Sequence, residues 1–324
     1  SFNHIKKNPT VFNTLKSHDI QCVFNDKHNN VWIGTTNGLD SYNQTNNTIT
    51  NITLPKQCIV KSICTDNNNN LWLGTDGDGL MRYNIQTKNI KTYKAIFHSN
   101  SLHNNSINSV AFDSINNCIW IGMYGGGLDK FDLRLQTFTN YPINNSVEMD
   151  NVVFDIQICK KNRIYISTIK DGLMEFNIKS NSLQKIIYTN QTADFKIEIT
   201  DIFLGKNNVL WLATTEGLYK YSNNKIVLCS DNNKISKYSY NTIIEDDLGN
   251  LWISSNHGLI KYNIPTEKFQ HNFIDSGIQG YIFNPRSGCK SNNGNIFFGG
   301  INGINFFNSS LFKPNLFLGN VIFT

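Results

Sequence analysis

Short apolar runs alternate with polar turns along the whole chain, and one arrangement of the two recurs seven times. Each copy has an apolar stretch, a turn rich in Asp, Asn and Gly, and then an apolar–aromatic–apolar strand that ends in small residues. Two or three variable residues follow, and then a glycine, an apolar residue and an aromatic. The first copy runs from Asp26 through Val31–Thr35 to Gly38 and Tyr42. Short apolar runs bounded by such turn residues predict β-strands.

The positions of the aromatic residues indicate that the seven copies are equivalent. All five tryptophans stand in the middle of the second strand, and Tyr165 and Phe297 fill that slot in the two remaining copies. The glycine that opens the third strand recurs every 41 to 48 residues, at positions 38, 79, 127, 172, 217, 258 and 303. A fixed period of this size is the signature of a repeat architecture.

Each copy predicts a four-stranded antiparallel meander, because glycine and Asn/Asp turns supply the backbone conformations that tight hairpins need. A lone sheet of this kind leaves two apolar faces in water, and radial stacking of the copies buries both. The sequence therefore predicts an all-β fold, a single seven-bladed β-propeller of four-stranded antiparallel blades over residues 1–308. The seven aromatic slots are expected to pack between blades and not to form a ligand platform.

The two ends of the chain suggest how the ring closes. The seventh copy has no evident fourth strand before the chain leaves at Asn308–Ser310, whereas Phe2–Ile5 has the pattern of a fourth strand without a blade of its own. We predict that this N-terminal strand completes the last blade. Residues 309–324 are expected to be a linker and the beginning of another domain.

Composition argues against several classes of function. The net charge is only +5, charged residues make up 16% of the chain, and no cluster of Lys and Arg marks a nucleic-acid footprint. The seven cysteines include no Cys-x-x-Cys pair, so neither a metal site nor a disulfide framework is expected. No apolar stretch reaches the length of a membrane span, and Ser1–His4 does not begin a signal peptide. Asn is about one residue in six, which suits a fold rich in turns.

Catalytic motifs are not evident. The sequence has no P-loop, no His-Glu-x-x-His motif and no EF-hand loop, and Gly125–Gly127 stands at a strand turn where it would not cradle a phosphate. The Asp-x-x-Gly-x-Leu-Trp turn is similar to the Asp box of sialidase propellers, but the few arginines do not provide their arginine triad. Streptogramin lyases, another propeller family, use His and Glu on one face. Because His257 and Glu216 stand in equivalent turns of adjacent blades, lyase chemistry stays open as an alternative.

The repeat Leu-Trp-Ile/Leu-Gly-Thr-x-x-Gly-Leu-x-x-Tyr-Asn resembles the two-component regulator propeller repeat over essentially the whole chain. In that family the repeats build periplasmic sensor regions of hybrid two-component systems in carbohydrate-degrading gut bacteria. Two seven-bladed propellers precede an immunoglobulin-like domain, a membrane helix, a histidine kinase, a receiver and a DNA-binding domain. The stretches 277–284 and 294–307 are similar to the last blade of the second propeller, and 313–324 to the first strand of the immunoglobulin-like domain.

This resemblance implies a periplasmic, membrane-proximal sensor propeller that has no catalytic activity and no cofactor. It implies an oligosaccharide ligand, contacts with the neighbouring propeller and immunoglobulin-like domain, dimerisation, and control of polysaccharide-utilisation genes through a histidine kinase. No direct contact of this region with nucleic acid is expected. The alternatives are a stand-alone propeller that binds a protein partner and, less favoured, a propeller lyase.

A ligand site is expected on the face where the turns between second and third strands and the loops between blades open. Binding residues belong on loops held by a rigid scaffold, and an oligosaccharide site would use aromatic faces and planar polar groups. Tyr281 and Arg286 are placed on the long loop before the last blade. The candidate ligand-binding residues are Asp76, Asp78, Tyr124, Lys170, Glu216, His257, Tyr281, Arg286 and Asn302.

Overall fold

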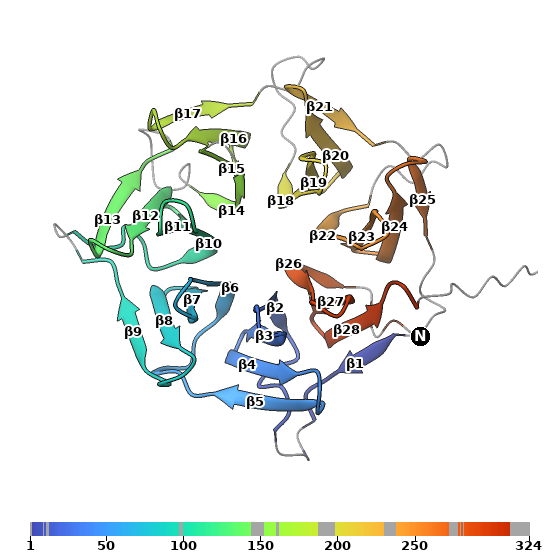
Figure 1. The fold of residues 1–324 in the computed structure, drawn as a ribbon, viewed down its shortest axis with the longest axis horizontal. Coiled ribbons are helices and arrows are strands. Elements are labelled where there is room, and N and C mark those ends of the chain that lie inside the picture. Colours follow the sequence, from blue (N-terminus) through green and yellow to red (C-terminus); the bar gives the residue numbers. More distant parts are fainter. Residues whose placement is uncertain are drawn as a thin grey trace, which may run out of the picture.

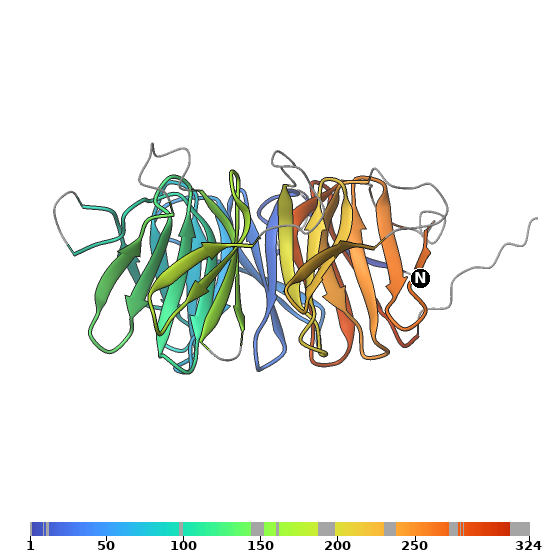
Figure 2. The same ribbon diagram turned by 90° about the horizontal axis from the view of Figure 1, so that it is seen from above.

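The fold is a closed ring of sheets. The computed structural model describes residues 2–8, 10, 13–96, 100–143, 152–159, 162–186, 198–229, 238–271, 278, 280 and 282–311. These described residues form seven four-stranded antiparallel sheets around one axis and contain no helix (Figure 1). Seen from the side, the sheets make a flat disc with turns on both faces (Figure 2). The predicted seven-bladed β-propeller is confirmed.

Within each of the first six blades the strands follow chain order, from the innermost strand at the axis to the outermost at the rim. Blade 1 holds β2 (Ile20–Asn25), β3 (Asn30–Thr35), β4 (Gly38–Asn43) and β5 (Thr48–Ile52). Blade 2 holds β6 (Val60–Thr65), β7 (Asn70–Thr75), β8 (Leu80–Asn84) and β9 (Ile90–Tyr93). Blade 3 holds β10 (Ile107–Asp113), β11 (Cys118–Met123), β12 (Leu128–Asp132) and β13 (Thr137–Tyr141).

The next three blades repeat this order. Blade 4 holds β14 (Val153–Cys159), β15 (Arg163–Thr168), β16 (Gly172–Asn177) and β17 (Ser182–Lys185). Blade 5 holds β18 (Ile199–Leu204), β19 (Leu210–Thr214), β20 (Gly217–Ser222) and β21 (Lys225–Leu228). Blade 6 holds β22 (Tyr240–Glu245), β23 (Asn250–Ser255), β24 (Gly258–Asn263) and β25 (Lys268–Gln270).

Blade 7 combines both ends of the chain. It holds β26 (Phe283–Lys290), β27 (Asn295–Gly300) and β28 (Gly303–Asn308), and its outer strand is β1 (Asn3–Ile5). Strand β1 pairs antiparallel with β28, with Asn3 opposite Phe306 and Ile5 opposite Ile304, and the two strands lie side by side in Figure 1. The predicted closure by the N-terminal strand is therefore confirmed. Residues 312–324, where the first strand of another domain is predicted, lie outside the described residues.

Aromatic side chains join every blade to the next. The slot residue of each second strand is buried, and its ring contacts the aromatic of the third strand in the following blade at a centroid distance between 4.6 and 6.3 Å. The pairs are Trp32–Tyr83, Trp72–Phe131, Trp120–Phe176, Tyr165–Tyr221, Trp211–Tyr262, Trp252–Phe307 and Phe297–Tyr42. The series is a full circuit, which confirms that the slots are structural. It also identifies Phe307, and not Phe306, as the seventh third-strand aromatic.

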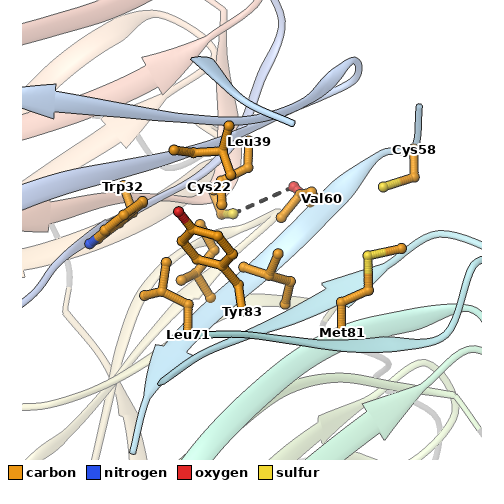
Figure 3. Close-up of a cluster of buried hydrophobic side chains, with 11 residues drawn as sticks. Cys22, Trp32, Leu39, Cys58, Val60, Leu71, Met81 and Tyr83 are labelled. Carbon is orange, nitrogen blue, oxygen red and sulfur yellow. Dashed lines mark hydrogen bonds between the residues drawn. The ribbon is translucent and has the colours of Figure 1, made fainter. Parts of the chain in front are cut away.

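Figure 3 shows one of these interfaces, between blades 1 and 2. Trp32 and Leu39 of blade 1 lie against Leu71 and Tyr83 of blade 2, and all four side chains are at most 5% exposed. The Cys22 thiol is directed at the carbonyl oxygen of Val60, with a sulfur–oxygen distance of 3.5 Å. Burying one large apolar side chain contributes about 1.5–3 kcal/mol, so each interface holds its two blades together strongly.

A buried aspartate satisfies the indole of the slot tryptophan. In blade 2, Asp66 Oδ1 accepts the backbone N–H groups of Asn68 and Asn70, while Oδ2 accepts the Trp72 Nε1–H at 2.9 Å. The equivalent carboxylates contact Trp32, Trp120 and Trp252 at 2.9, 3.4 and 2.9 Å. One carboxylate therefore folds the first turn of the blade and also removes the cost of burying an indole N–H.

Two of the three exceptions support this explanation, and blade 5 departs from it. Tyr165 and Phe297, which have no indole N–H, are preceded at the aspartate position by Cys159 and Ser291. Blade 5 keeps Trp211 but has Gly205 at that position, and Glu245 of blade 6 reaches across to accept the Lys206 N–H at 2.9 Å. In six of the seven blades the aspartate is thus present where the slot holds a tryptophan and absent where it does not.

Deleting residues 1–8 tests ring closure. The deletion removes the strand that covers β28, together with the side chains of Phe2 and Ile5, each of which is only 7% exposed in the ring. The apolar surface that these two side chains cover becomes exposed to water. We expect the melting temperature to fall by about 5 °C or more, since each lost side chain contributes about 1.5–3 kcal/mol. His4→Ala, at an exposed position in the same strand, is the control, and calorimetry is the measurement. A deletion variant that melts with the wild type would contradict closure by β1.

Asp66→Ala tests the coupling of turn and indole. The substitution leaves the Trp72 Nε1–H and two backbone N–H groups without their acceptor, so we expect a loss of about 3 kcal/mol in the free energy of unfolding. In a Trp72→Phe background the same change should cost at least about 1 kcal/mol less, because no indole needs the carboxylate. Denaturant titration of the double-mutant cycle measures the difference, with Asp132→Ala in a surface turn as the control. Additive effects would refute the coupling.

Candidate functional site: the axis of the ring

The predicted ligand residues between second and third strands stand in turns of different blades. Asp76 and Asp78 lie in blade 2, and the others follow one to a blade from blade 3 to blade 7, at Tyr124, Lys170, Glu216, His257 and Asn302. All of these turns open on one face, but they encircle the axis at the ends of separate sheets (Figure 1). Tyr281 lies outside the described residues. The structure therefore arranges these candidates as a rim, and their role in binding stays a prediction.

Asp76 and Asp78 already have partners within the protein. Asp76 Oδ1 accepts the Ser106 hydroxyl at 2.9 Å, and Oδ2 lies 3.0 Å from Lys61 Nζ. Burial acts to raise the pKa of Asp76, but the hydrogen bonds from Lys61 and Ser106 and the charge of Lys61 outweigh it and lower the pKa. Asp78 is 7% exposed and lies 3.0 Å from Lys56 Nζ. A ligand would have to compete with these contacts.

His257 and Glu216, the pair considered for lyase chemistry, are both exposed. The His257 ring packs on Tyr238 at 4.4 Å between centroids, and its Nδ1 lies 2.8 Å from Asn256 Oδ1. The Glu216 backbone N–H donates to the Thr214 hydroxyl. Among the described residues no hydrogen bond joins His257 to Glu216.

Arg286 is not on the inter-blade loop where the sequence analysis places it. It lies within β26, the innermost strand of blade 7, where the pairing with β27 is irregular between Phe283 and Gly288. The extra residues in this bulge turn the Arg286 side chain across the axis. Its Nη1 donates to the carbonyl oxygens of Asn108 in blade 3, at 2.8 Å, and of Phe154 in blade 4. The expectation failed because a bulge, which a repeat pattern does not reveal, lengthens this strand.

Arg286 also carries two signs of strain. Its φ is +56°, in the left-handed region that non-glycine residues rarely adopt. Its Nε atom is buried and has no hydrogen-bond partner among the described residues. Strained backbone and unsatisfied buried donors persist where the surrounding structure enforces them, and they concentrate at functional sites.

Around the axis, seven equivalent positions of the innermost strands form what we call the axial belt: Cys22, Ser62, Ser109, Asp155, Asp201, Thr242 and Ser287. Each belt side chain hydrogen-bonds to the next blade. Examples are the Ser62 hydroxyl, which accepts the Val110 N–H at 3.0 Å, and the Ser287 hydroxyl, which donates to the Ile20 carbonyl at 3.1 Å. The others complete the circle.

Two adjacent members of the belt are carboxylates. Asp155 Oδ2 accepts the Ile202 N–H at 2.9 Å, and Asp201 Oδ2 accepts the Ile243 N–H at 2.7 Å. Burial and the neighbouring carboxylate of Asp155 raise the pKa of Asp201 well above its ordinary value, although the Ile243 N–H and the Arg286 charge act in the opposite direction. The axis thus holds one arginine and two acidic side chains, of which Asp201 resists ionisation.

Two cavities meet at this group. One, of about 400 Å³, lies where the innermost strands of blades 5–7 lead into their first turns. The other, of about 190 Å³, is lined by the innermost strands of blades 1–5. Asp201 and Arg286 line both cavities. The sequence analysis missed Asp155 and Asp201. Comparing the seven copies at the belt position would have found them, since only these two copies place a carboxylate there.

No group of three or more His, Cys, Asp or Glu side chains that could hold a metal ion occurs among the described residues. The seven cysteines are free thiols, four of them buried, and they are dispersed over the blades. No helix long and apolar enough to cross a membrane is found in the described ranges.

Sequence comparison identifies the class of the repeat. Residues 14–37 and 53–77 match the family model of the two component regulator propeller. A curated relative, Histidine kinase P4 of Formosa agariphila, is 25% identical over 257 residues, which are 75% of this chain and 18% of the relative. Two segments of the chain therefore match the two-component regulator propeller repeat that the sequence analysis predicts, and the chain spans about a fifth of the length of the histidine kinase that it matches.

Solved structures agree on the fold. The extracellular domains of two hybrid two-component systems from B. thetaiotaomicron, BT4673 and BT3049, superimpose with TM-scores of 0.76 and 0.74 at 19% and 17% identity. Each comparison covers 94% of this chain and 39% or 42% of the solved chain. A streptogramin B lyase also superimposes, with a TM-score of 0.74 at 12% identity over 94% of this chain and 96% of the lyase. At these identities the likeness concerns the propeller fold alone.

The acidity of Asp201 gives a pH test. A carboxyl group whose pKa is higher in the folded than in the unfolded protein favours folding at low pH, and this contribution disappears as the pH rises through the folded-state pKa. Asp201→Asn removes the buried ionisation next to Asp155 and Arg286 and keeps an oxygen for the Ile243 N–H. We expect a melting temperature a few degrees above that of the wild type at pH 8 and little change at pH 4. Equal shifts at both pH values would show that Asp201 is normally ionised.

Proposed function

We propose that this chain is the oligosaccharide-sensing propeller of a histidine kinase of the hybrid two-component class. The observation that carries the proposal is the match of its repeats to the two component regulator propeller, together with the sequence relationship to a histidine kinase. The solved neighbours are extracellular domains of such systems, which supports a position outside the cytoplasm, in the periplasm. The output that we propose is control of polysaccharide-utilisation genes.

The chain itself acts in this proposal as a non-catalytic receptor that needs no cofactor. A closed ring held by aromatic contacts at every blade boundary is a rigid support for a ligand. We further propose that the chain contacts a second propeller and an immunoglobulin-like domain of the same protein, and that two copies dimerise to align their kinases.

Calorimetric titration with oligosaccharide fragments of plant, host and microbial polysaccharides tests this function. We expect one class of fragment to bind and to raise the melting temperature as its concentration increases, since a ligand of the folded state stabilises by mass action. Tyr124→Ala, which removes a side chain that is 41% exposed on the rim, should weaken binding at least fivefold if the rim contributes. Arg286→Ala needs a parallel melting curve, because that arginine also ties blade 7 to blades 3 and 4.

The whole receptor gives the decisive measurement. In membranes that contain the full-length protein, the bound oligosaccharide should change the rate of autophosphorylation from ATP, and unrelated oligosaccharides should not. If the complete gene encodes no kinase, or if no fragment binds, the sensor function is wrong. A stand-alone propeller that binds a protein partner would then be the better explanation.

A further inference from the structure

The 400 Å³ cavity has the size and the polarity of a ligand site. Its volume is near the lower end of the range of about 300–1,000 Å³ that ligand pockets occupy. One wall is apolar and includes Phe203, Leu204 and Ile244, whereas Asp201, Thr242 and Arg286 supply polar groups. An apolar wall opposite a few oriented polar groups is the surface that a sugar ring requires, because its C–H faces are apolar and its hydroxyls are not.

Arg286 presents an unused donor at this place. Both of its hydrogen bonds run from Nη1 to carbonyl oxygens of blades 3 and 4, which leaves the buried Nε–H without an acceptor among the described residues. A guanidinium carries five donors in a fixed plane, so fixing Nη1 also fixes the direction of Nε–H. The protein therefore maintains an oriented donor beside Asp201, whose carboxyl group can accept.

The charges around the cavity nearly cancel. Lys206, Lys290 and Arg286 line it together with Glu245 and Asp201. Lys290 Nζ lies 2.6 Å from Asp247 Oδ1, and Asp155 stands next to Asp201 in the belt. Three cations and two carboxyl groups therefore line the cavity, and Asp247 and Asp155 lie just outside the lining. Of these carboxyl groups Asp201 resists ionisation. A charged ligand would leave a net charge in a partly buried site, which is costly, whereas a neutral one would not.

We propose that the cavity at the axis of blades 5–7 binds one unit of a neutral sugar, with a hydroxyl that donates to Asp201 and another hydroxyl oxygen that accepts from the Arg286 guanidinium. The inference rests on the proposed oligosaccharide-sensing function and adds the place and the charge class of the ligand. The site lies at the first turns of the blades, on the face opposite the rim of Tyr124 and His257.

Calorimetric titration of the whole chain with two matched sets of probes tests the proposal. The neutral set is xylo-, gluco-, galacto- and manno-oligosaccharides, and the charged set is oligogalacturonides and chitosan oligomers. We expect binding of at least one neutral probe and weaker or absent binding of both charged sets. Asp201→Asn keeps the size of the side chain and one oxygen acceptor. It should weaken binding of the neutral probe at least tenfold, while the melting temperature stays at or above that of the wild type.

The matched control is Asp132→Asn, the same replacement at the end of β12 in blade 3, which does not line the cavity. This variant should bind the neutral probe with an affinity within twofold of that of the wild type. If a neutral probe binds equally well to Asp201→Asn and to the wild type, the axial site is wrong and the sensor function stands. Tighter binding of a charged probe overturns the charge argument. If no probe binds, both the inference and the oligosaccharide-sensing function fail.

Discussion

The contact between one blade's slot aromatic and the next blade's third-strand aromatic is the interaction on which this structure depends. A four-stranded meander has two apolar faces, and neither can be buried within its own sheet. Seven such contacts run in the same direction around the disc, from Trp32–Tyr83 to Phe297–Tyr42. The last of them joins the end of the chain to its beginning. The pairing of β1 with β28 inside blade 7 joins the two ends of the chain by backbone hydrogen bonds, so ring closure uses both packing and sheet formation.

A buried aromatic side chain that carries a polar N–H needs a hydrogen-bond acceptor, and in this chain the acceptor comes from a residue close by in the sequence. A tryptophan brings an indole N–H into the interface, and for four of the five tryptophans the aspartate six or seven residues earlier accepts it while folding the turn. Where the slot holds Phe297 the aspartate is absent, because there is no indole to satisfy. This relation explains why acidic turns and tryptophans occur together along the chain.

The axis differs from the interfaces because its seven strands are not chemically equivalent. At the belt position five blades use small neutral side chains, whereas blades 4 and 5 use Asp155 and Asp201. Arg286 then enters from blade 7 through a bulge. The seven blades are therefore equivalent in backbone arrangement, but their side chains differ at the axis. This difference places two carboxyl groups and one guanidinium there. The rim candidates, by contrast, stand in separate turns, and some, such as Asp78, are engaged by neighbouring lysines.

The sequence by itself determined the strands, the number of blades, the aromatic slots and the closing strand, because these follow from local turn chemistry and from a pattern repeated along the chain. It also pointed to the family of the repeat. Only the tertiary structure decided that Phe307 completes the aromatic circuit, that Arg286 lies in a bulged inner strand, and that Asp155 and Asp201 meet it. Those residues are more than 40 positions apart in sequence, and they come together only because seven twisted sheets close around one axis.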